Sequence, residues 1–414
     1  MTFEEKEEER LQISLTEQVM QKADASRELS DQELLELIEQ VVRERWQKRY
    51  LSIETRRSIK RGIFNSLRRL DVLQELLDDP TVTEIMVNGA EHIFVEREGR
   101  LYCTECRFVN EQRLRDVIQR IASRVNRVVN EANPIVDARL PDGSRVNIVL
   151  PPVALDGPMV TIRKFPEERI TMEKLIAMDS ITTAAADFLK GLVRAGYNIF
   201  ISGGTGAGKT TFLNALSDYI PEGERIVTIE DSAELQIHNI PNLVRLEMRS
   251  ANVEGSHAVT IRDLIKTSLR MRPSRIIVGE VRDAASIDML QSLNTGHSGM
   301  STGHANSPAD MLSRLETMVL LGEDIPLVAV RKQIASAIDL IIQLGRLRDK
   351  SRKVLSIVEV LDYEDGEITL NPLFEYTEEG EEPDGKLKGR LVPTGRRLRH
   401  TQKLLAAGEM VSEV

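Results

Sequence analysis

Gly203-Gly204-Thr205-Gly206-Ala207-Gly208-Lys209-Thr210 fills the pattern Gly-x-x-x-x-Gly-Lys-[Ser/Thr] without a mismatch. An apolar run of the β type, residues 197–202, leads into it, and residues 211–217 leave it with helical spacing. A strand, a glycine loop and a helix in this order are the setting of a phosphate-binding loop, whose N–H groups surround a phosphate at the positive end of the helix dipole. We therefore predict a nucleoside triphosphate site at residues 203–211. Lys209 would reach the β- and γ-phosphates, the Thr210 hydroxyl would bind Mg²⁺, and Thr211 would complete the loop-to-helix junction.

The composition is that of an ordinary soluble globular protein, with 41% hydrophobic and 29% charged residues. A length of 414 residues favours two or three domains. The formal net charge of −10 argues against a non-specific grip on nucleic acid or anionic lipid. The acidic first ten residues have no apolar core, and no apolar run has the length of a membrane span, so we expect a cytoplasmic location.

Cys103 and Cys106 are the only two cysteines, spaced Cys-x-x-Cys. One such pair supplies two ligands, whereas a structural zinc site needs four. No second pair and no nearby histidine cluster completes the set. We interpret both as ordinary cysteines in a region of strands and loops.

Three kinds of pattern divide the first 180 residues. Residues 1–79 are predicted to form a helical extension, with a capping box at Ser30-Asp-Gln-Glu33 and a further helix over 55–78 that Pro80 ends. Residues 80–166 are predicted to form a small α+β domain. Its expected strands and helix are 84–88, 92–96, 100–106, 111–130 (helix), 145–150 and 159–164. The polar stretch 167–180 is predicted to be a linker.

Residues 181–414 alternate between helical and β-type patterns. The β-type runs include Ile199, 226–229, 243–246 and 276–278, and this alternation indicates a mostly parallel sheet. Two more helices (308–320 and 326–336), small strands and an acidic run (378–384), interpreted as a solvated hairpin tip, follow. The predicted fold class is therefore α/β.

Two of the predicted strands end in carboxylates, at Glu230-Asp231 and at Glu280. Ligands of parallel sheets bind beyond the carboxyl ends of the strands, so we expect these acids near the phosphates. Gly279 occupies the place where an Mg²⁺-binding aspartate usually stands. Glu280 is therefore the better candidate for activating water, with Glu230 and Thr210 sharing the metal shell. The alternative for each acid is a carboxylate at a solvated strand end.

Residues 294–306 hold two of the six histidines, His297 and His304, among glycines and small polar residues. A metal site is a poor match, because no cysteine or close carboxylate accompanies them. A sensor that hydrogen-bonds the γ-phosphate fits a nucleotide enzyme better, and we assign it to His304. A histidine used only for packing is the alternative for both.

Four segments in order carry a specific resemblance: 203–210, 228–235, 277–282 and 302–308. They resemble the Walker A motif, Asp box, atypical Walker B motif and His box of the type II/type IV secretion ATPase superfamily. Segments 83–89, 268–273, 294–297 and 313–319 resemble its CpaF-type branch, the ATPases of Flp (tight-adherence) pilus assembly. The similarity extends from about Leu70 to the end of the chain.

The resemblance implies a RecA-like P-loop ATPase core behind the smaller N-terminal domain, with ATP and Mg²⁺ as cofactors and ATP in the cleft between the two domains. It also implies a hexameric ring, peripheral on the inner face of the cytoplasmic membrane, that works on an inner-membrane platform protein. The direction of work, extension or retraction of the pilus, stays open.

Residue roles carried over by the resemblance make Glu280 the catalytic glutamate, Glu230 a support for metal or water, and His304 the phosphate sensor. Arginines of the N-terminal domain usually reach the phosphates in this family, and the matching positions are Arg139, Arg145 and Arg163. The chain departs from the family pattern at Gly303, where relatives commonly have an apolar residue. It also lacks the tetracysteine insert of many type II members.

Two alternatives from other classes remain. A RecA-like nucleic-acid translocase would need a basic channel with stacking side chains, which the negative charge and the 4% aromatic content disfavour. We therefore expect no specific nucleic-acid partner. A nucleotide-gated binding module or GTPase switch is weakened by the lack of an Asn-Lys-x-Asp guanine-reading motif.

Overall fold

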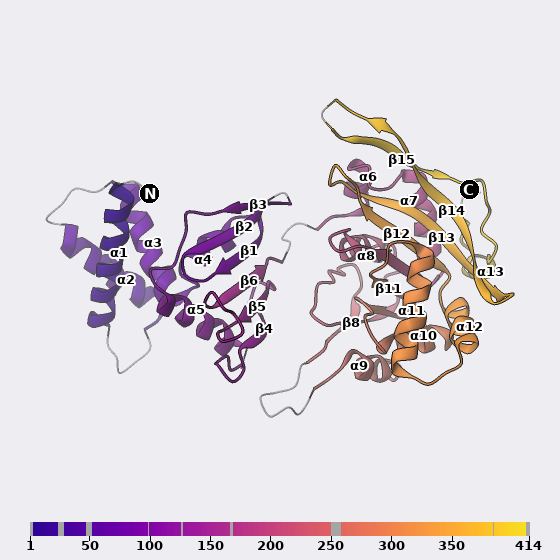
Figure 1. Ribbon diagram of the computed structural model, residues 1–414, viewed down its shortest axis with the longest axis horizontal. Helices are drawn as coiled ribbons and strands as arrows, with labels where there is room; N and C mark the ends of the chain where they lie inside the picture. Colours follow the sequence, from indigo (N-terminus) through magenta and orange to yellow (C-terminus); the bar gives the residue numbers. More distant parts are fainter. Residues whose placement is uncertain are drawn as a thin grey trace. The chain divides into compact units, whose positions relative to one another are not determined.

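The computed structural model describes residues 3–23, 29–46, 52–97, 99–125, 127–165, 169–249, 258–383 and 385–410. The chain forms two compact units, unit 1 (Met1–Glu167) and unit 2 (Glu168–Val414) (Figure 1). Pro166 at the end of the predicted α+β domain, residues 167–168 at the start of the predicted linker and Asp384 of the predicted acidic tip lie outside the described residues.

Three helices open unit 1: α1 (Phe3–Lys22), α2 (Asp31–Trp46) and α3 (Ile53–Arg68). They share a small core of their own, formed by Leu15, Val19, Leu34, Ile38, Val41, Val42, Ile59 and Ile63. The predicted capping box is present, because the Glu33 N–H donates to Ser30 Oγ (3.3 Å) and the Ser30 N–H donates to the Glu33 carboxylate (2.8 Å).

The helix predicted over 55–78 is in fact two helices, α3 and α4 (Leu73–Asp78). Asp71 between them has a φ of 53°, in the left-handed region where a right-handed helix cannot continue. The Ser66 hydroxyl donates to the Asp71 carboxylate (3.0 Å) and holds this turn. The prediction of one continuous helix was wrong because the apolar periodicity persists across the break.

The rest of unit 1 is a six-stranded antiparallel sheet with the order β3-β2-β1-β6-β5-β4. Its strands are β1 (Val82–Asn88), β2 (His92–Arg97), β3 (Arg100–Cys103), β4 (Ile135–Arg139), β5 (Arg145–Val149) and β6 (Met159–Arg163). Helices α4 and α5 (Glu111–Arg124) share one apolar core with this sheet. The predicted strands are present, although the one expected over 100–106 ends at Cys103. Strand β4 was not predicted, and α5 ends six residues before the expected position.

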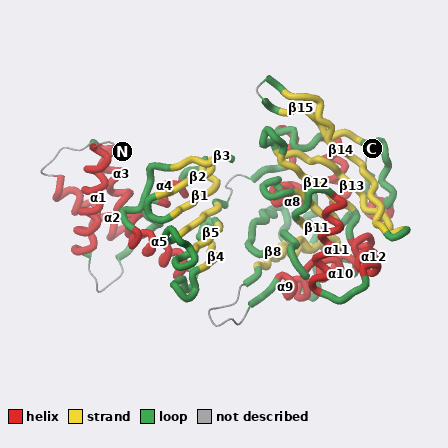
Figure 2. The backbone as a smooth tube through the Cα atoms, in the orientation of Figure 1, coloured by secondary structure: helices red, strands yellow, loops and turns green. Residues whose placement is uncertain are grey.

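Unit 2 is built on a nine-stranded sheet with the order β15-β14-β13-β12-β7-β11-β10-β8-β9 (Figures 1 and 2). The six strands from β12 to β9 are parallel, and β13, β14 and β15 extend the sheet in antiparallel fashion. The strands are β7 (Ile199–Gly203), β8 (Arg225–Glu230), β9 (Asn242–Glu247), β10 (Arg275–Val278), β11 (Ser298–Gly303), β12 (Leu340–Arg346), β13 (Arg352–Glu364), β14 (Glu367–Glu381) and β15 (Leu387–Pro393).

Helices cover both faces of this sheet, because successive strand residues point to opposite sides. Ile199 and Ile201 belong to the core that contains α6 (Met172–Ala177), α7 (Thr183–Arg194), α8 (Lys209–Ser217) and α13 (Gln402–Ala407). Phe200 belongs to the opposite core, which contains α9 (Ile261–Ser268), α10 (Ala285–Asn294), α11 (Pro308–Gly322) and α12 (Leu327–Ala337). The predicted α/β class with a mostly parallel sheet is confirmed.

Helix α6 occupies part of the stretch 167–180 that was expected to be a linker. Thr171 caps it by accepting a hydrogen bond from the Lys174 N–H, and Met172 and Leu175 lie buried in a core of unit 2. None of the helices in the described ranges combines the length and apolar character that a membrane span requires.

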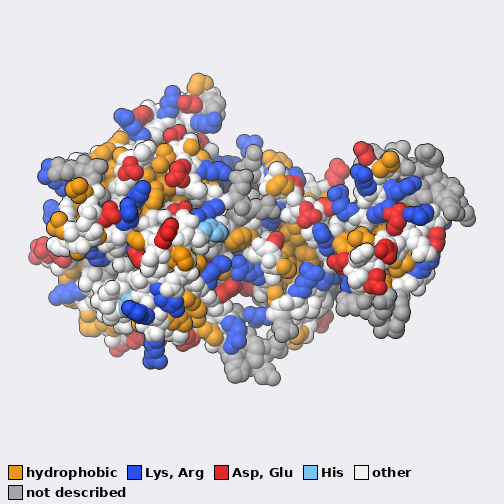
Figure 3. All heavy atoms as spheres, turned by 180° about the vertical axis from the view of Figure 1, so that it is seen from behind, with side chains coloured by type: hydrophobic (Ala, Val, Ile, Leu, Met, Phe, Trp, Pro, Cys, Tyr) orange, Lys and Arg blue, Asp and Glu red, His pale blue; other side chains and the backbone are white. Residues whose placement is uncertain are grey.

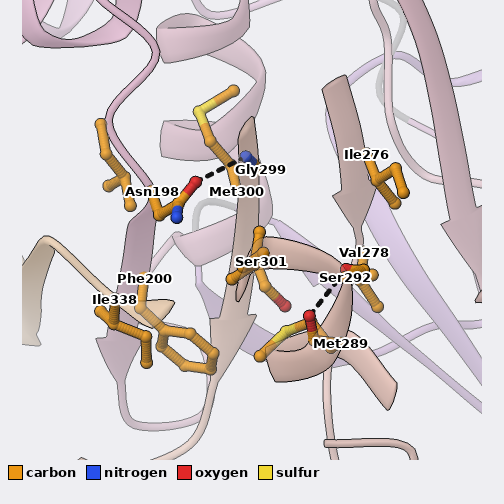
Figure 4. A pocket seen from close by; sticks show the side chains of 12 residues that line it. Asn198, Phe200, Ile276, Val278, Met289, Ser292, Gly299, Met300, Ser301 and Ile338 are labelled. Carbon is orange, nitrogen blue, oxygen red and sulfur yellow. Dashed lines mark hydrogen bonds between the residues drawn. The ribbon is translucent and has the colours of Figure 1, made fainter. Parts of the chain in front are cut away.

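Strand β11 was also not predicted, although it lies in the middle of the sheet between β7 and β10. Apart from Met300, the residues of β11 (Ser-Gly-Met-Ser-Thr-Gly) are small, and at both glycines the neighbours leave no room for a side chain. A Cβ on Gly299 would stand 2.5 Å from Leu293 Cδ2, and one on Gly303 would stand 2.8 Å from the Phe200 ring. Figure 4 shows Gly299, Met300 and Ser301 of β11 among the residues that line a pocket, with the Asn198 side chain accepting from the Gly299 N–H (3.0 Å).

Candidate functional site

The predicted phosphate loop joins the buried strand β7 to helix α8. Gly206 and Gly208 have φ values of 71° and 92°, which glycine adopts without steric cost. Lys209, at the start of α8, is 8% exposed. Its ammonium group donates to the carbonyl groups of Gly203 and Gly204 at 3.2 Å each. The carbonyl groups of the loop therefore hold the ammonium group of the lysine that the sequence assigns to the phosphates.

His304 connects Lys209 to Glu280. Its Nδ1 lies 3.2 Å from Lys209 Nζ, and its Nε2 lies 3.1 Å from Glu280 Oε1. Lys209 begins α8, His304 follows β11, and Glu280 follows β10. Three of the predicted site residues thus meet at the carboxyl ends of neighbouring parallel strands, where such sheets bind ligands.

The charges at this place are set by burial and by near neighbours. Burial lowers the pKa of His304, and the positive charge of Lys209 lowers it further against the opposing effect of Glu280, so the imidazole is neutral at neutral pH. Burial alone would raise the pKa of Glu280. The Arg282 guanidinium donates to Glu280 Oε2 (2.8 Å) and lowers the pKa of Glu280, and His304 and Lys209 lower it further. Together these three groups outweigh the effect of burial, so the pKa of Glu280 lies below its ordinary value. Glu280 is therefore ionised.

One oxygen of Glu280 stays available. Oε1 is buried and accepts no hydrogen bond, because the 3.1 Å approach of His304 Nε2 lacks hydrogen-bond alignment. The other oxygen is held by Arg282, whose guanidinium also lies 3.4 Å from the Asp231 carboxylate. The arginine fixes the carboxylate on one side and leaves the other side for a ligand.

Glu230 ends strand β8 and is 3% exposed. Its Oε1 accepts the N–H groups of Glu234 (2.7 Å) and Leu235 (2.8 Å), which shapes the loop after β8. Its Oε2 is buried without a hydrogen-bond partner. Burial raises the pKa of Glu230 to about 7, against the lowering effect of the two backbone hydrogen bonds.

Gly279 makes room for Glu230. A Cβ at position 279 would stand 2.9 Å from Glu230 Cγ, closer than carbon atoms approach without displacement. A side chain at 279 and the observed position of Glu230 therefore exclude each other. This packing explains why a glycine stands at the position where an Mg²⁺-binding aspartate is usual.

Gly279→Ala is expected to displace Glu230 and to lower the stability of the fold by about 1–3 kcal/mol, as overpacking does in well-packed regions. Thermal unfolding of the purified variant measures the effect. Gly223→Ala is the matched control, since a Cβ at Gly223 meets nothing within 4 Å. Equal melting temperatures for the two variants would contradict the steric argument.

The raised pKa of Glu230 predicts a pH-dependent stability. The folded protein holds a proton on Glu230 between the ordinary pKa of 4.5 and about 7, whereas the unfolded chain does not. The contribution of this proton to the free energy of unfolding is complete below pH 4.5 and is lost as the pH rises through about 7. Between about pH 5 and about pH 8, the free energy of unfolding of the wild type should fall by roughly 1–3 kcal/mol relative to that of Glu230→Gln. Parallel melting curves in metal-free buffer test this, and a difference that does not change with pH would contradict it.

The donor groups suit a magnesium ion. Glu230 Oε2 and Glu280 Oε1 are buried carboxylate oxygens without hydrogen bonds, and Thr210 places a hydroxyl in the first turn of α8. Mg²⁺ prefers such hard oxygen ligands and usually takes one or two from the protein and the rest from phosphates and water. In the segments that the structure describes, no group of three or more His, Cys, Asp or Glu side chains forms a self-sufficient metal site.

The other predicted histidine, His297, precedes β11 and therefore lies at the end of that strand opposite to His304. Its Nδ1 lies 3.3 Å from the Ser292 carbonyl and from Thr295 Oγ1. These local contacts are those of a packing residue.

Arg139, Arg145 and Arg163 belong to unit 1, where they form one row across three strands. Arg139 on β4 lies opposite Arg145 on β5, and Arg145 lies opposite Arg163 on β6. Directly opposite residues share a face of the sheet, and like charges in such positions destabilise it.

Two arginines that sequence reasoning missed lie beside the loop. Arg352 Nε donates to the Gly206 carbonyl (2.8 Å), and Arg346 Nη1 lies 3.9 Å from the position a Cβ on Gly206 would take. Both belong to the β12–β13 hairpin, more than 130 residues along the chain. No motif marks them, so only the sheet order reveals their place.

Comparisons with known proteins identify the family of this chain. The model of the family described as "Type II/IV secretion system protein" matches residues 67–385. A Mycobacterium tuberculosis protein named after conjugal transfer is 37% identical over 304 residues, which are 72% of this chain and 86% of that protein. The type IV secretion system protein VirB11 of Bartonella quintana is 30% identical over 325 residues, 69% of this chain and 90% of VirB11.

Among solved structures, the pilus retraction motor PilT with bound ADP covers 83% of this chain and 88% of PilT, with a TM-score of 0.53 and 18% identity. At this identity the likeness shows a shared fold. The family model covers well over half of the sequence. The chain therefore belongs to the type II/IV secretion system protein family.

Proposed function

We propose that this chain is an ATPase whose turnover powers a pilus or secretion machine. The observation that carries the proposal is the convergence of Lys209, His304 and Glu280 beside a complete phosphate loop. Within the family, we propose the CpaF-type branch and therefore the assembly of a Flp pilus, with retraction as a further direction of work. The segments quoted for that branch in the sequence support this finer assignment.

Each of the three residues has a distinct task in this proposal. The loop N–H groups and Lys209 bind the phosphates of ATP. Glu280, ionised and with Oε1 available, accepts the proton of the attacking water as a general base. His304 lies within 3.2 Å of both, so it senses a phosphate at Lys209 and passes the change to Glu280.

Magnesium, when bound, would neutralise charge on the phosphates, and the residues placed to hold it are Thr210, Glu230 and Glu280. Glu230 is the weakest of these ligands, since its raised pKa leaves it partly protonated at neutral pH. Its two backbone hydrogen bonds suit it equally to holding the loop after β8.

The row of Arg139, Arg145 and Arg163 supplies positive charge for the phosphates in this proposal. Arg163 has a side chain that is 62% exposed, and it lies 3.9 Å from Glu84. An arginine that reaches the transferred phosphoryl group contributes about 10³–10⁵ in rate. Whether it acts in its own subunit or in a neighbour is a property of the assembled ring.

For the partners, we propose a homo-oligomer, a hexamer by the family pattern, on the cytoplasmic face of the inner membrane, where it would act on a platform protein. VirB11 is named as a protein of a type IV secretion system, and PilT is described as a pilus retraction motor. The relationship to VirB11 supports a task in secretion for this chain, and PilT shares its fold.

The nucleic-acid translocase is less well supported. On the face shown in Figure 3, basic and acidic side chains are interspersed over the visible surface of both units. The experiment that separates the two functions is ATP turnover by the purified chain with and without DNA and with and without EDTA. Turnover that EDTA abolishes and DNA leaves unchanged is expected. Stimulation by DNA would favour the translocase.

A further inference from the structure

The β12–β13 hairpin lies directly beside the phosphate loop. Strand β12 pairs with β7 up to the contact of Leu344 with Gly203, and then continues past the loop to Arg346. Arg346 and Arg352 are direct cross-strand partners, the last pair before the hairpin turn. The sheet therefore places two guanidinium groups at the outer side of residues 203–208.

Arg352 lies along the loop. Its Nε donates to the Gly206 carbonyl at 2.8 Å, and its Cδ lies 3.4 Å from the position that a Cβ on Gly208 would take. The Gly206 carbonyl and the Ala207 N–H belong to one planar peptide unit and point in opposite directions. By holding the Gly206 carbonyl, Arg352 also fixes the direction of the Ala207 N–H, one of the loop N–H groups that phosphate-binding loops use.

The loop itself restrains this peptide only weakly. The Ala207 N–H donates to the Gly204 carbonyl at 3.3 Å, which is long for such a bond. The bond from Arg352 is shorter and carries a charge, and charge-assisted hydrogen bonds are the stronger kind. Arg352 is therefore the main restraint on the Gly206–Ala207 peptide.

The charges of the hairpin point to an anion. Two arginines directly opposite each other repel, and the described residues offer neither Arg346 nor Arg352 an acidic partner. Arg348, in the turn between them, shows the contrast, because it pairs with Glu378 (2.7 Å) and Glu381 (3.2 Å). Within the described residues, acidic side chains therefore pair with Arg348 in the turn and not with Arg346 and Arg352 beside the loop.

We propose that Arg352 is a positioning residue of the phosphate loop and that Arg346 binds the phosphates of the nucleotide in the same chain. This inference rests on the proposed ATP site and deepens it. Unit 2 then carries its own cationic groups for the phosphates, independent of the arginines of unit 1.

The test is the binding of ADP, measured by calorimetry, together with the kcat and KM of ATP hydrolysis. Arg346→Gln and Arg352→Gln are each expected to weaken ADP binding about 10- to 100-fold, as the loss of a charged hydrogen bond does. The affinity for AMP should fall less than the affinity for ADP, because AMP carries only one phosphate. Arg352→Lys keeps a positively charged donor for the Gly206 carbonyl, whereas the donor of Arg352→Gln is neutral, so Arg352→Lys should restore binding to within about threefold of the wild type.

Arg348→Gln is the matched control, because it removes an arginine of the same hairpin. Its affinity for ADP is expected to stay within about twofold of the wild type. The proposal is overturned if Arg346→Gln and Arg352→Gln bind ADP as Arg348→Gln does. It is likewise overturned if Arg352→Lys is as weak as Arg352→Gln. If Arg352→Gln fails to fold, the ADP affinities of Arg346→Gln and Arg352→Lys test the proposal in its place. A wild type that binds no ADP would instead refute the proposed function itself.

Discussion

Lys209→Ala is expected to abolish measurable binding of ATP and ADP. Lys209 is the buried cation of the site, with its ammonium group 3.2 Å from two loop carbonyls and from His304. Removing it deletes the charge that offsets the phosphates and also a group that holds His304 neutral. We expect the Kd for ADP to rise by at least about 100-fold, which is about 2.7 kcal/mol. Calorimetric titration measures it.

Lys332→Ala, which removes a lysine from α12, is the control for the loss of one positive charge. The two variants should unfold at similar temperatures, since Lys209 contributes polar contacts to the loop and not to an apolar core. ADP affinity in Lys209→Ala equal to that of the control would show that the loop does not bind the nucleotide through this residue.

Glu280→Gln is expected to bind ATP and to lose about 10²–10⁴ in kcat, the range for removing a general base. This loss corresponds to about 3–5 kcal/mol of activation free energy. The amide keeps the shape of the side chain and an oxygen for the hydrogen bond from Arg282, so the structure around it should persist. Single-turnover kinetics with ATP in excess of its Kd separate binding from chemistry.

Glu230→Gln provides the comparison, because Glu230 is the second acid of the site and differs in burial and in pKa. If Glu280→Gln retained its turnover while Glu230→Gln lost it, the role of general base would belong to Glu230. Loss in Glu280→Gln alone supports Glu280 as the base.

The local parts of the site could be predicted from the sequence. The phosphate loop is continuous in the chain, and its strand, glycines and helix are all encoded within about twenty residues. Glu230, Glu280 and His304 follow strands of one parallel sheet, so their proximity follows from the rule that carboxyl ends meet at one edge. The structure adds the order of contact, with His304 between Lys209 and Glu280.

Other features depend on packing between segments that are distant in the chain. Strand β11 has no apolar alternation, because Gly299 and Gly303 are imposed by the side chains of Leu293 and Phe200. The reason for Gly279 is the position of Glu230, about fifty residues away. Neither cause is visible in a linear pattern.

The helix break at Asp71 and the arginines of the hairpin were missed for related reasons. Apolar periodicity continues from α3 into α4, while the break is made by one backbone angle, the φ of 53° at Asp71. Arg346 and Arg352 are placed by the pairing of β12 with β7, a fact of strand order that single-sequence patterns do not contain.

The central claim is that the site around Lys209, His304 and Glu280 hydrolyses ATP within an oligomer. The most direct test measures steady-state ATP hydrolysis by the wild type and by Glu280→Gln over a range of protein concentrations, with particle size followed by light scattering. We predict turnover per chain that rises as the oligomer forms and that is lost in Glu280→Gln. Turnover that is absent from the assembled wild type, or that survives in Glu280→Gln, would contradict the claim.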